Sequence, residues 1–129
     1  MILVDTSVWI EFFRKSSRFQ ITAVVDLDEV VTCLPVIQEI LQGFDDQKAF
    51  RIAKEALLAL PVLEAPLSGD VFLLAVELYR TARRIGLTVR SSTDCLIAAC
   101  ALRADVTILH RDRDFDALAR VAPLDVRRI

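Results

Sequence analysis

The chain has 129 residues, 54% of them hydrophobic, with three glycines and four prolines; this argues against a disordered or low-complexity protein and fits a single domain over residues 1–129. Its 16 basic and 18 acidic residues give a net charge of -2, without the basic excess that a nucleic-acid partner usually leaves. No apolar run is long enough to cross a bilayer, and no basic start or long apolar core of a signal peptide follows Met1, so we expect a cytosolic protein.

Strand and helix signals alternate through the first half of the chain. In chain order they predict a strand at 1–5, a helix at 7–15, an apolar helix around 19–28, a strand at 29–33, a helix at 35–44 and an amphipathic helix at 45–60. Thr6 and Ser7 supply capping groups for the first helix, and Pro35 suits the first turn of its helix. Gly43 and Pro61 are expected to end the helices that precede them.

The second half continues the alternation. It predicts a strand at 62–65, a long helix at 68–86, a helix at 93–104, a strand at 106–109, a short helix at 115–122 and a final strand at 125–129. Strands separated by helices need crossover connections, so we expect a mainly parallel sheet with helices on both faces. In such α/β sheets, ligands bind at the carboxyl ends of the strands, where the strand order reverses.

Four acidic residues are predicted to gather at that end of the sheet. They are Asp5, Glu39, Asp94 and Asp112. Hard divalent cations such as Mg²⁺ prefer carboxylate oxygens and keep positions for water and a substrate phosphate. An all-acid set without His or Cys fits such a cation better than zinc, and it indicates metal-assisted hydrolysis.

Each acid also has an ordinary structural explanation. Asp5, Asp94 and Asp112 suit helix N-termini, where a carboxylate caps free N–H groups and favours the helix dipole. For each of these three aspartates taken singly, capping is a sufficient explanation. Glu39 is harder to explain in this way, because it lies in the apolar helix at 35–44, where only a narrow side can be polar.

Several other chemistries are excluded by spacing. The acids at 112–116 (DRDFD) suggest a calcium loop, but the EF-hand needs Gly and Glu where this chain has Ala117 and Pro123. No glycine-rich phosphate loop occurs, and a Ser-His-Asp triad using His110 lacks its elbow serine. The single His110 is therefore predicted to be a polar residue at a strand end.

The cysteines and arginines carry weaker signals. Cys33, Cys95 and Cys100 lie in apolar contexts without C-x-x-C spacing, which predicts buried reduced thiols. Thirteen of the 16 basic residues are arginines, and basic residues cluster at Arg14, Lys15 and Arg18; at Arg80, Arg83, Arg84 and Arg90; and at Arg111 and Arg113. Arginine suits bidentate phosphate contacts, although a solvated helix face explains any single one more readily.

Four segments resemble a known family in their order and spacing. VDTSVWIEFF, PVIQEIL, SSTDCLIAACAL and LHRDRDFDALA are similar to the motifs of the PIN domain, and in particular to the VapC-like toxins of bacterial toxin–antitoxin pairs. The resemblance covers essentially the whole chain, and the acids of the four motifs are separated by 34, 55 and 18 residues. It implies a PIN-like three-layer α/β fold and an endoribonuclease that hydrolyses RNA phosphodiester bonds.

The resemblance also implies roles for individual residues. The expected catalytic and metal-binding acids are Asp5, Glu39, Asp94 and Asp112, with Asp114 as an outer or additional metal ligand and Ser7 as a hydroxyl near the substrate. Mg²⁺ or Mn²⁺, an RNA substrate, a homodimer and an antitoxin protein that blocks the site are implied as well. We expect an arginine of the antitoxin to plug the acidic site, because its planar fork bridges two carboxylates.

Three alternative functions require features that differ from those of a PIN-domain ribonuclease. A receiver domain needs a phospho-accepting Asp after its third strand, where this chain offers only Glu64. A nuclease acting on structured DNA needs extra segments to grip a duplex, for which 129 residues leave little room. A protein-binding module with a vestigial site predicts no hydrolysis with any metal.

The three aspartates near the last helix can be ranked. Asp112 follows the fourth strand and is expected to be a direct ligand. Asp114 either caps the last helix or approaches the metal through water. Asp116, beyond a buried Phe115, is expected to point toward solvent and to matter least.

Overall fold

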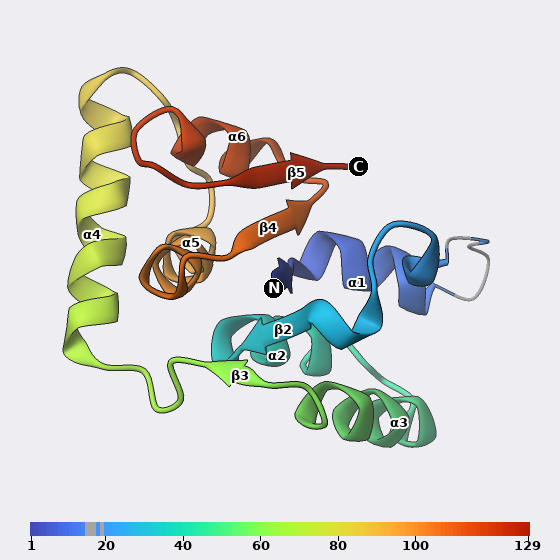
Figure 1. The fold of residues 1–129 in the computed structure, drawn as a ribbon. Coiled ribbons are helices and arrows are strands. Elements are labelled where there is room, and N and C mark those ends of the chain that lie inside the picture. Colours follow the sequence, from blue (N-terminus) through green and yellow to red (C-terminus); the bar gives the residue numbers. More distant parts are fainter. Residues whose placement is uncertain (15–17, 19) are drawn as a thin grey trace.

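The computed structural model describes residues 1–14, 18 and 20–129, so Lys15 of the first basic cluster and residue 19 of the predicted second helix lie outside the described residues. One parallel sheet runs through the centre in the order β3-β2-β1-β4-β5 (Figure 1). Its strands are β1 (Ile2–Val4), β2 (Val30–Cys33), β3 (Val62–Leu63), β4 (Thr107–His110) and β5 (Val126–Arg128).

Helices connect and cover the strands. Within the described residues they are α1 (Thr6–Phe13), α2 (Leu34–Leu41), α3 (Gln47–Leu58), α4 (Gly69–Arg84), α5 (Ser92–Ala104) and α6 (Arg113–Ala119). The chain moves outward from β1 to β3 on one side and from β4 to β5 on the other. Because parallel crossovers are almost always right-handed, this reversal of direction brings helices to both faces, and the predicted α/β fold is confirmed.

The strand order reverses between β1 and β4, the two central strands. Asp5 N–H donates to Leu109 O over 2.9 Å, so the two strands stay paired to their carboxyl ends. Leu3 and Ile108, which pair across them, are fully buried. This rigid centre is the position where open α/β sheets place their ligands.

Helix α5 is the most deeply buried helix segment near that centre. Its buried side chains, apart from Asp94, are Cys95, Ile97, Ala98, Ala99, Cys100 and Ala101. A helix that is apolar almost all round has to be buried, and its small side chains let α4 pack closely beside it (Figure 1). Burial of α5 therefore carries the carboxylate of Asp94, in its first turn, into the interior.

The predicted helix around 19–28 is wrong for the described residues. Two short 3-10 turns, Ile21–Ala23 and Leu27–Glu29, occupy this segment. Its β-branched side chains lose rotamer freedom in a helix, and the Asp26 carboxylate accepts a hydrogen bond from Asp28 N–H, which favours a turn. The helix was predicted from the apolar content of this segment, but the residues that supply that content are poor helix formers.

Other boundaries shift by a residue or two. The last helix begins at Arg113, two residues earlier than predicted, because the carboxylate of Asp112 accepts from Asp114 N–H and caps it. Helix α2 ends at Leu41, just before Gly43.

No helix in the described part of the chain is long and apolar enough to span a membrane. All three cysteines are buried and unpaired, as predicted.

Candidate metal centre

Asp5 is the N-cap of α1 at the carboxyl end of β1. Its Oδ2 accepts from Ser7 N–H over 3.0 Å and from Ser7 Oγ over 2.5 Å. Its Oδ1 is buried without a hydrogen-bond partner among the described residues. Burial raises the pKa of Asp5, although the two bonds from Ser7 oppose that rise. The capping role predicted for Asp5 is confirmed, but it accounts for one oxygen only.

Glu39 enters the site from α2 and is held by a neighbour of Asp5. Thr6 Oγ1, itself buried, donates to Glu39 Oε1 over 2.9 Å. Glu39 is half-buried, and this burial raises the pKa of its carboxyl group, with smaller contributions from Asp5 and Asp112. The carboxylate that looked out of place in an apolar helix therefore does have a partner, the Thr6 hydroxyl.

Asp94 lies between the other acids. It is 5% exposed, and its Oδ2 has no hydrogen-bond partner within the described part of the structure. Burial and a hydrogen bond with Asp114 raise the pKa of Asp94 to about 9. Such a shift is expected where carboxyl groups share a buried site, because one proton relieves their repulsion.

Asp112 and Asp114 lie on the far side of Asp94, and one arginine contacts both. The Arg90 guanidinium lies 3.3 Å from Asp112 Oδ1 and 3.5 Å from Asp114 Oδ1. Arg90 N–H also donates to Asp114 Oδ2 over 3.0 Å. Asp114 is 2% exposed and does not cap α6, so the capping alternative for it is wrong.

The acids form two groups joined by Asp94. Asp5, Glu39 and Asp94 each bring one oxygen within 4.8 Å of the others, and so do Asp94, Asp112 and Asp114. Carboxylate oxygens are the donors that Mg²⁺ and Mn²⁺ prefer, and two of them, on Asp5 and Asp94, are buried without partners among the described residues. The residues present therefore fit a hard divalent cation.

Comparison with known proteins agrees with this arrangement. The PIN domain family matches residues 2–121. The chain belongs to the PIN-domain family. It is 41% identical to VapC ribonuclease Mb1587 of Mycobacterium bovis and to Ribonuclease VapC11 of Mycobacterium tuberculosis, and each match covers 96% of both chains. The receiver-domain alternative is thereby excluded.

Solved structures show the same fold. VapBC of Salmonella typhimurium bound to DNA matches with a TM-score of 0.78 at 13% identity, covering 98% of this chain and 96% of that one. VapBC-5 of Mycobacterium tuberculosis matches with a TM-score of 0.72 at 22% identity, covering 98% and 97%. The PIN-like fold predicted from the sequence is confirmed.

Two contributors to this PIN-domain site were missed by sequence reasoning. Thr6 was read only as a helix-capping residue, and the motif that contains it gives no sign that its hydroxyl reaches Glu39, 33 residues away. Arg90 was seen only as a member of a basic cluster. It comes from the segment between α4 and α5, 22 residues before Asp112, and no spacing rule connects the two.

His110 lies fully buried at the end of β4, as predicted for a polar residue at a strand end. Its Nδ1 accepts from Asp112 N–H over 3.1 Å, so the imidazole holds the backbone of a site residue. Its Nε2 lies 3.4 Å from Asp116 Oδ1, and Arg128 pairs with the other Asp116 oxygen. The Asp116 side chain is 43% exposed, in line with the expectation that it points toward solvent, and its one ion-pair partner among the described residues, apart from His110, whose pKa is lowered by burial, is the exposed Arg128.

Ser7 is more fully engaged than predicted. Its Oγ donates to Asp5 and accepts from Arg111 N–H over 3.0 Å. The hydroxyl thus ties the start of α1 to the turn after β4. Contact with the substrate remains a prediction, whereas support of Asp5 is visible.

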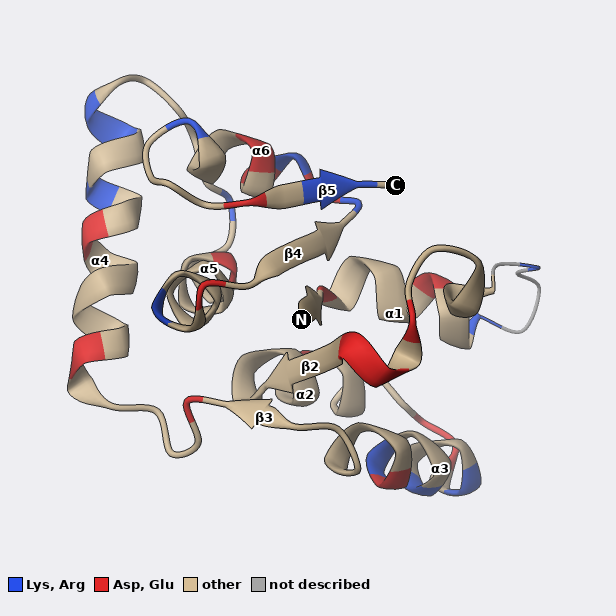
Figure 2. Cartoon of the chain, in the orientation of Figure 1, with Lys and Arg blue, Asp and Glu red and all other residues tan. Residues whose placement is uncertain are grey.

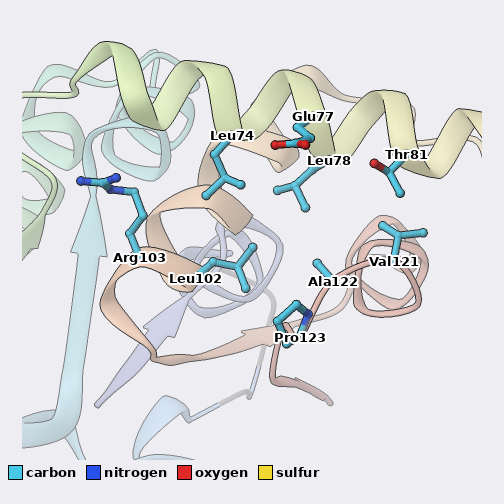
Figure 3. Close-up of a pocket in the computed structure, with 9 residues that line it drawn as sticks. All are labelled: Leu74, Glu77, Leu78, Thr81, Leu102, Arg103, Val121, Ala122 and Pro123. Atoms are coloured by element: carbon cyan, nitrogen blue, oxygen red, sulfur yellow. The ribbon is translucent and has the colours of Figure 1, made fainter.

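A separate pocket lies at the other end of α5. Figure 3 shows side chains from α4, the end of α5 and the 121–123 segment around it, including Leu78, Leu102 and Pro123. Arg103 lines this pocket and lies nine residues after Asp94, or about 13 Å along the helix. None of the clustered acids lines it, so it is not part of the metal centre.

Proposed function

We propose that this chain is an endoribonuclease that hydrolyses RNA phosphodiester bonds, and the toxin of a toxin–antitoxin pair. The observation that carries the proposal is the cluster of acids at the strand reversal, in which Asp5 and Asp94 each have a buried oxygen without a hydrogen-bond partner among the described residues. The likeness to VapC ribonucleases over almost the whole chain supports it. We also propose that residues 1–129 form one catalytic domain.

A Mg²⁺ or Mn²⁺ ion is the cofactor that we propose. Asp5, Asp94, Asp112 and Asp114 are the residues that would hold it, with Glu39 beside them. When bound, such an ion supplies Lewis-acid chemistry, lowering the pKa of a water molecule and neutralising charge on phosphate oxygens.

The residues around the cluster divide the remaining work. Ser7 fixes Asp5, and the Thr6 hydroxyl fixes Oε1 of Glu39. Glu39 is half-exposed and has a raised pKa, so we assign it the acceptance of a proton from the attacking water, a task that favours a pKa closer to neutral. Asp94 is buried and belongs to both groups of acids, so we assign it the role of holding the two groups at a fixed distance.

RNA cleavage by the purified, partner-free protein tests this proposal. Cleavage should require Mg²⁺ or Mn²⁺, stop in chelator and vanish in Asp5→Asn and Asp94→Asn, while circular dichroism shows an intact fold. Asp70→Asn, an exposed acid in the first turn of α4, is the matched control and should cleave normally. Full activity in chelator, or in both site variants, would contradict the proposal.

An antitoxin segment is the proposed inhibitor. A pocket of about 350 Å³ between α1 and α2 is lined by Ile10, Phe13, Ile40 and Phe44, and Glu39 stands at its wall. Apolar side chains of the partner suit this pocket, and an arginine beside them would reach Glu39. Solved VapBC-5 of Mycobacterium tuberculosis is described as a toxin–antitoxin system, which supports a partner of this kind. A co-purified partner that bound elsewhere and left cleavage unchanged would contradict this assignment.

A homodimer and a cytosolic location complete the proposal. Phe72, Leu73 and Val76 are exposed on α4, and an apolar helix face of this kind supports association with another copy. Light scattering of the purified protein tests the dimer, and cell fractionation tests the location.

A further inference from the structure

A second pocket opens directly beside the acids, and its walls are basic. It has a volume of about 420 Å³, and its lining residues are Ser7, Arg90, Arg111, Asp112, Arg113 and Arg128. Four arginines and one aspartate thus line this pocket in a chain whose net charge is -2. Figure 2 shows basic residues on β5 and on the turn that follows β4.

The pocket is continuous with the metal centre through two shared residues. Asp112 lines the pocket and also belongs to the acid group with Asp94 and Asp114. Ser7 lines the pocket and donates to Asp5. An extended polymeric ligand bound across the acids therefore also reaches the arginines of the pocket.

Local stability does not explain all of these arginines. Arg113 is the first residue of α6, where the helix dipole disfavours a cation. It is exposed and makes no ion pair with any residue that the structure describes. Among the described residues, the Arg111 guanidinium pairs only with Glu11, at 3.6 Å, and the Arg111 side chain is 45% exposed. Both guanidinium groups can exchange solvent or a weak contact for a stronger anion.

We propose that this arginine pocket binds a phosphate of the RNA strand next to the phosphate that is cleaved, and so fixes the direction of the strand across the acids. The proposal rests on the proposed ribonuclease function and adds the site that holds the substrate. The planar, five-donor guanidinium fits phosphate oxygens in pairs, and several of them in one pocket suit a polyanion better than a neutral ligand. An acidic segment of a protein partner is the competing occupant.

RNA binding without cleavage tests the pocket. The parent is Asp94→Asn, and the probe is a fluorescently labelled single-stranded RNA titrated over a range of salt concentrations. Arg113→Gln and Arg111→Gln should each weaken binding several-fold and lower the slope of log K against log salt by about 0.7, the value for one phosphate contact on a single strand. Arg120→Gln is the matched control, because it removes the same charge from the other end of α6, roughly 10 Å away.

Cleavage kinetics of variants that retain Asp94 distinguish a role of the pocket in RNA binding from a role in the cleavage step. Arg113→Gln should raise KM with kcat largely retained, because the arginine binds the strand and does not touch the scissile phosphate. An equal loss in Arg113→Gln and Arg120→Gln, or an unchanged salt slope, would overturn the pocket while the ribonuclease function stands. Loss of antitoxin binding with RNA binding intact would overturn it in favour of an acidic protein segment. If the parent bound no RNA and the unchanged protein cleaved none with metal, both proposals would fall together.

Discussion

Replacing Asp94 by Asn should change how the stability of the metal-free protein depends on pH. The pKa of Asp94 is raised to about 9 from an ordinary value of 3.8, first by burial and then by its hydrogen bond with Asp114. Between these two values the folded protein holds a proton that the unfolded chain has released. Folding therefore takes up a proton, and stability falls as pH rises through this window.

The size of the effect follows from the proton count. One full proton of difference lowers the free energy of unfolding by about 1.4 kcal/mol for each pH unit. Between pH 5.5 and 8.5 the loss due to Asp94 is therefore at most about 4 kcal/mol. Asn cannot titrate, so Asp94→Asn should lack this part of the slope and gain stability over the parent at high pH.

Urea unfolding in chelator measures this difference. The single Trp9 is buried and stacks on Phe13, so its fluorescence reports unfolding. The stability of Asp94→Asn relative to the parent should increase steadily from pH 5.5 to 8.5, whereas Asp70→Asn should follow the parent. Parallel pH profiles for the parent and Asp94→Asn would refute the reasoning. Added Mg²⁺ at pH 8.5 should stabilise the parent more than Asp94→Asn, because the cation takes over the role of the proton.

Three further predictions concern the end of the chain. In RNA cleavage at saturating Mg²⁺, Asn substitutions should hurt most at Asp112, less at Asp114 and least at Asp116, which is half-exposed and pairs with Arg128 at the surface; equal loss at Asp112 and Asp116 would contradict the ranking. His110→Asn keeps an acceptor near the Nδ1 position and should retain more Mn²⁺ affinity by calorimetry than His110→Gln, and the reverse order would show that support of the Asp112 backbone is not its role. Phe115→Ala should cost about 3–5 kcal/mol in urea unfolding because this fully buried ring packs beside His110, and a cost below about 1 kcal/mol would contradict its place in the core.

The position of the acids could be predicted because it depends on strand ends. Asp5 and Asp112 follow the two central strands, and a parallel sheet brings the carboxyl ends of its strands to one edge. Glu39 stood out because a carboxylate in an apolar helix needs a partner. These inferences use only local periodicity and chain order, which a single sequence contains.

The failures involve contacts that no local pattern encodes. Arg90 reaches Asp112 and Asp114 from a segment without regular structure. In the sequence it is one member of a basic cluster, and nothing there connects it with these two acids. Asp116 was expected to point toward solvent and is half-exposed, but no local pattern showed that β5 brings Arg128 beside it. In each case the partner arrives through the packing of distant segments.

The distribution of cations around the cluster gives it a direction. Asp112 and Asp114 share the guanidinium of Arg90, whereas no Lys or Arg of the described residues pairs with Asp5, Glu39 or Asp94. Negative charge is thus offset on one side of Asp94 and left uncompensated on the other. On the uncompensated side, two hydroxyl groups of α1 fix the acids by hydrogen bonds: Ser7 donates to Asp5, and Thr6 donates to Glu39. A divalent cation gains most by binding where no guanidinium competes, so within the proposed ligand set it should lie nearest to Asp5 and Asp94, with Glu39 beside it and with Arg90 on the opposite side available for phosphate.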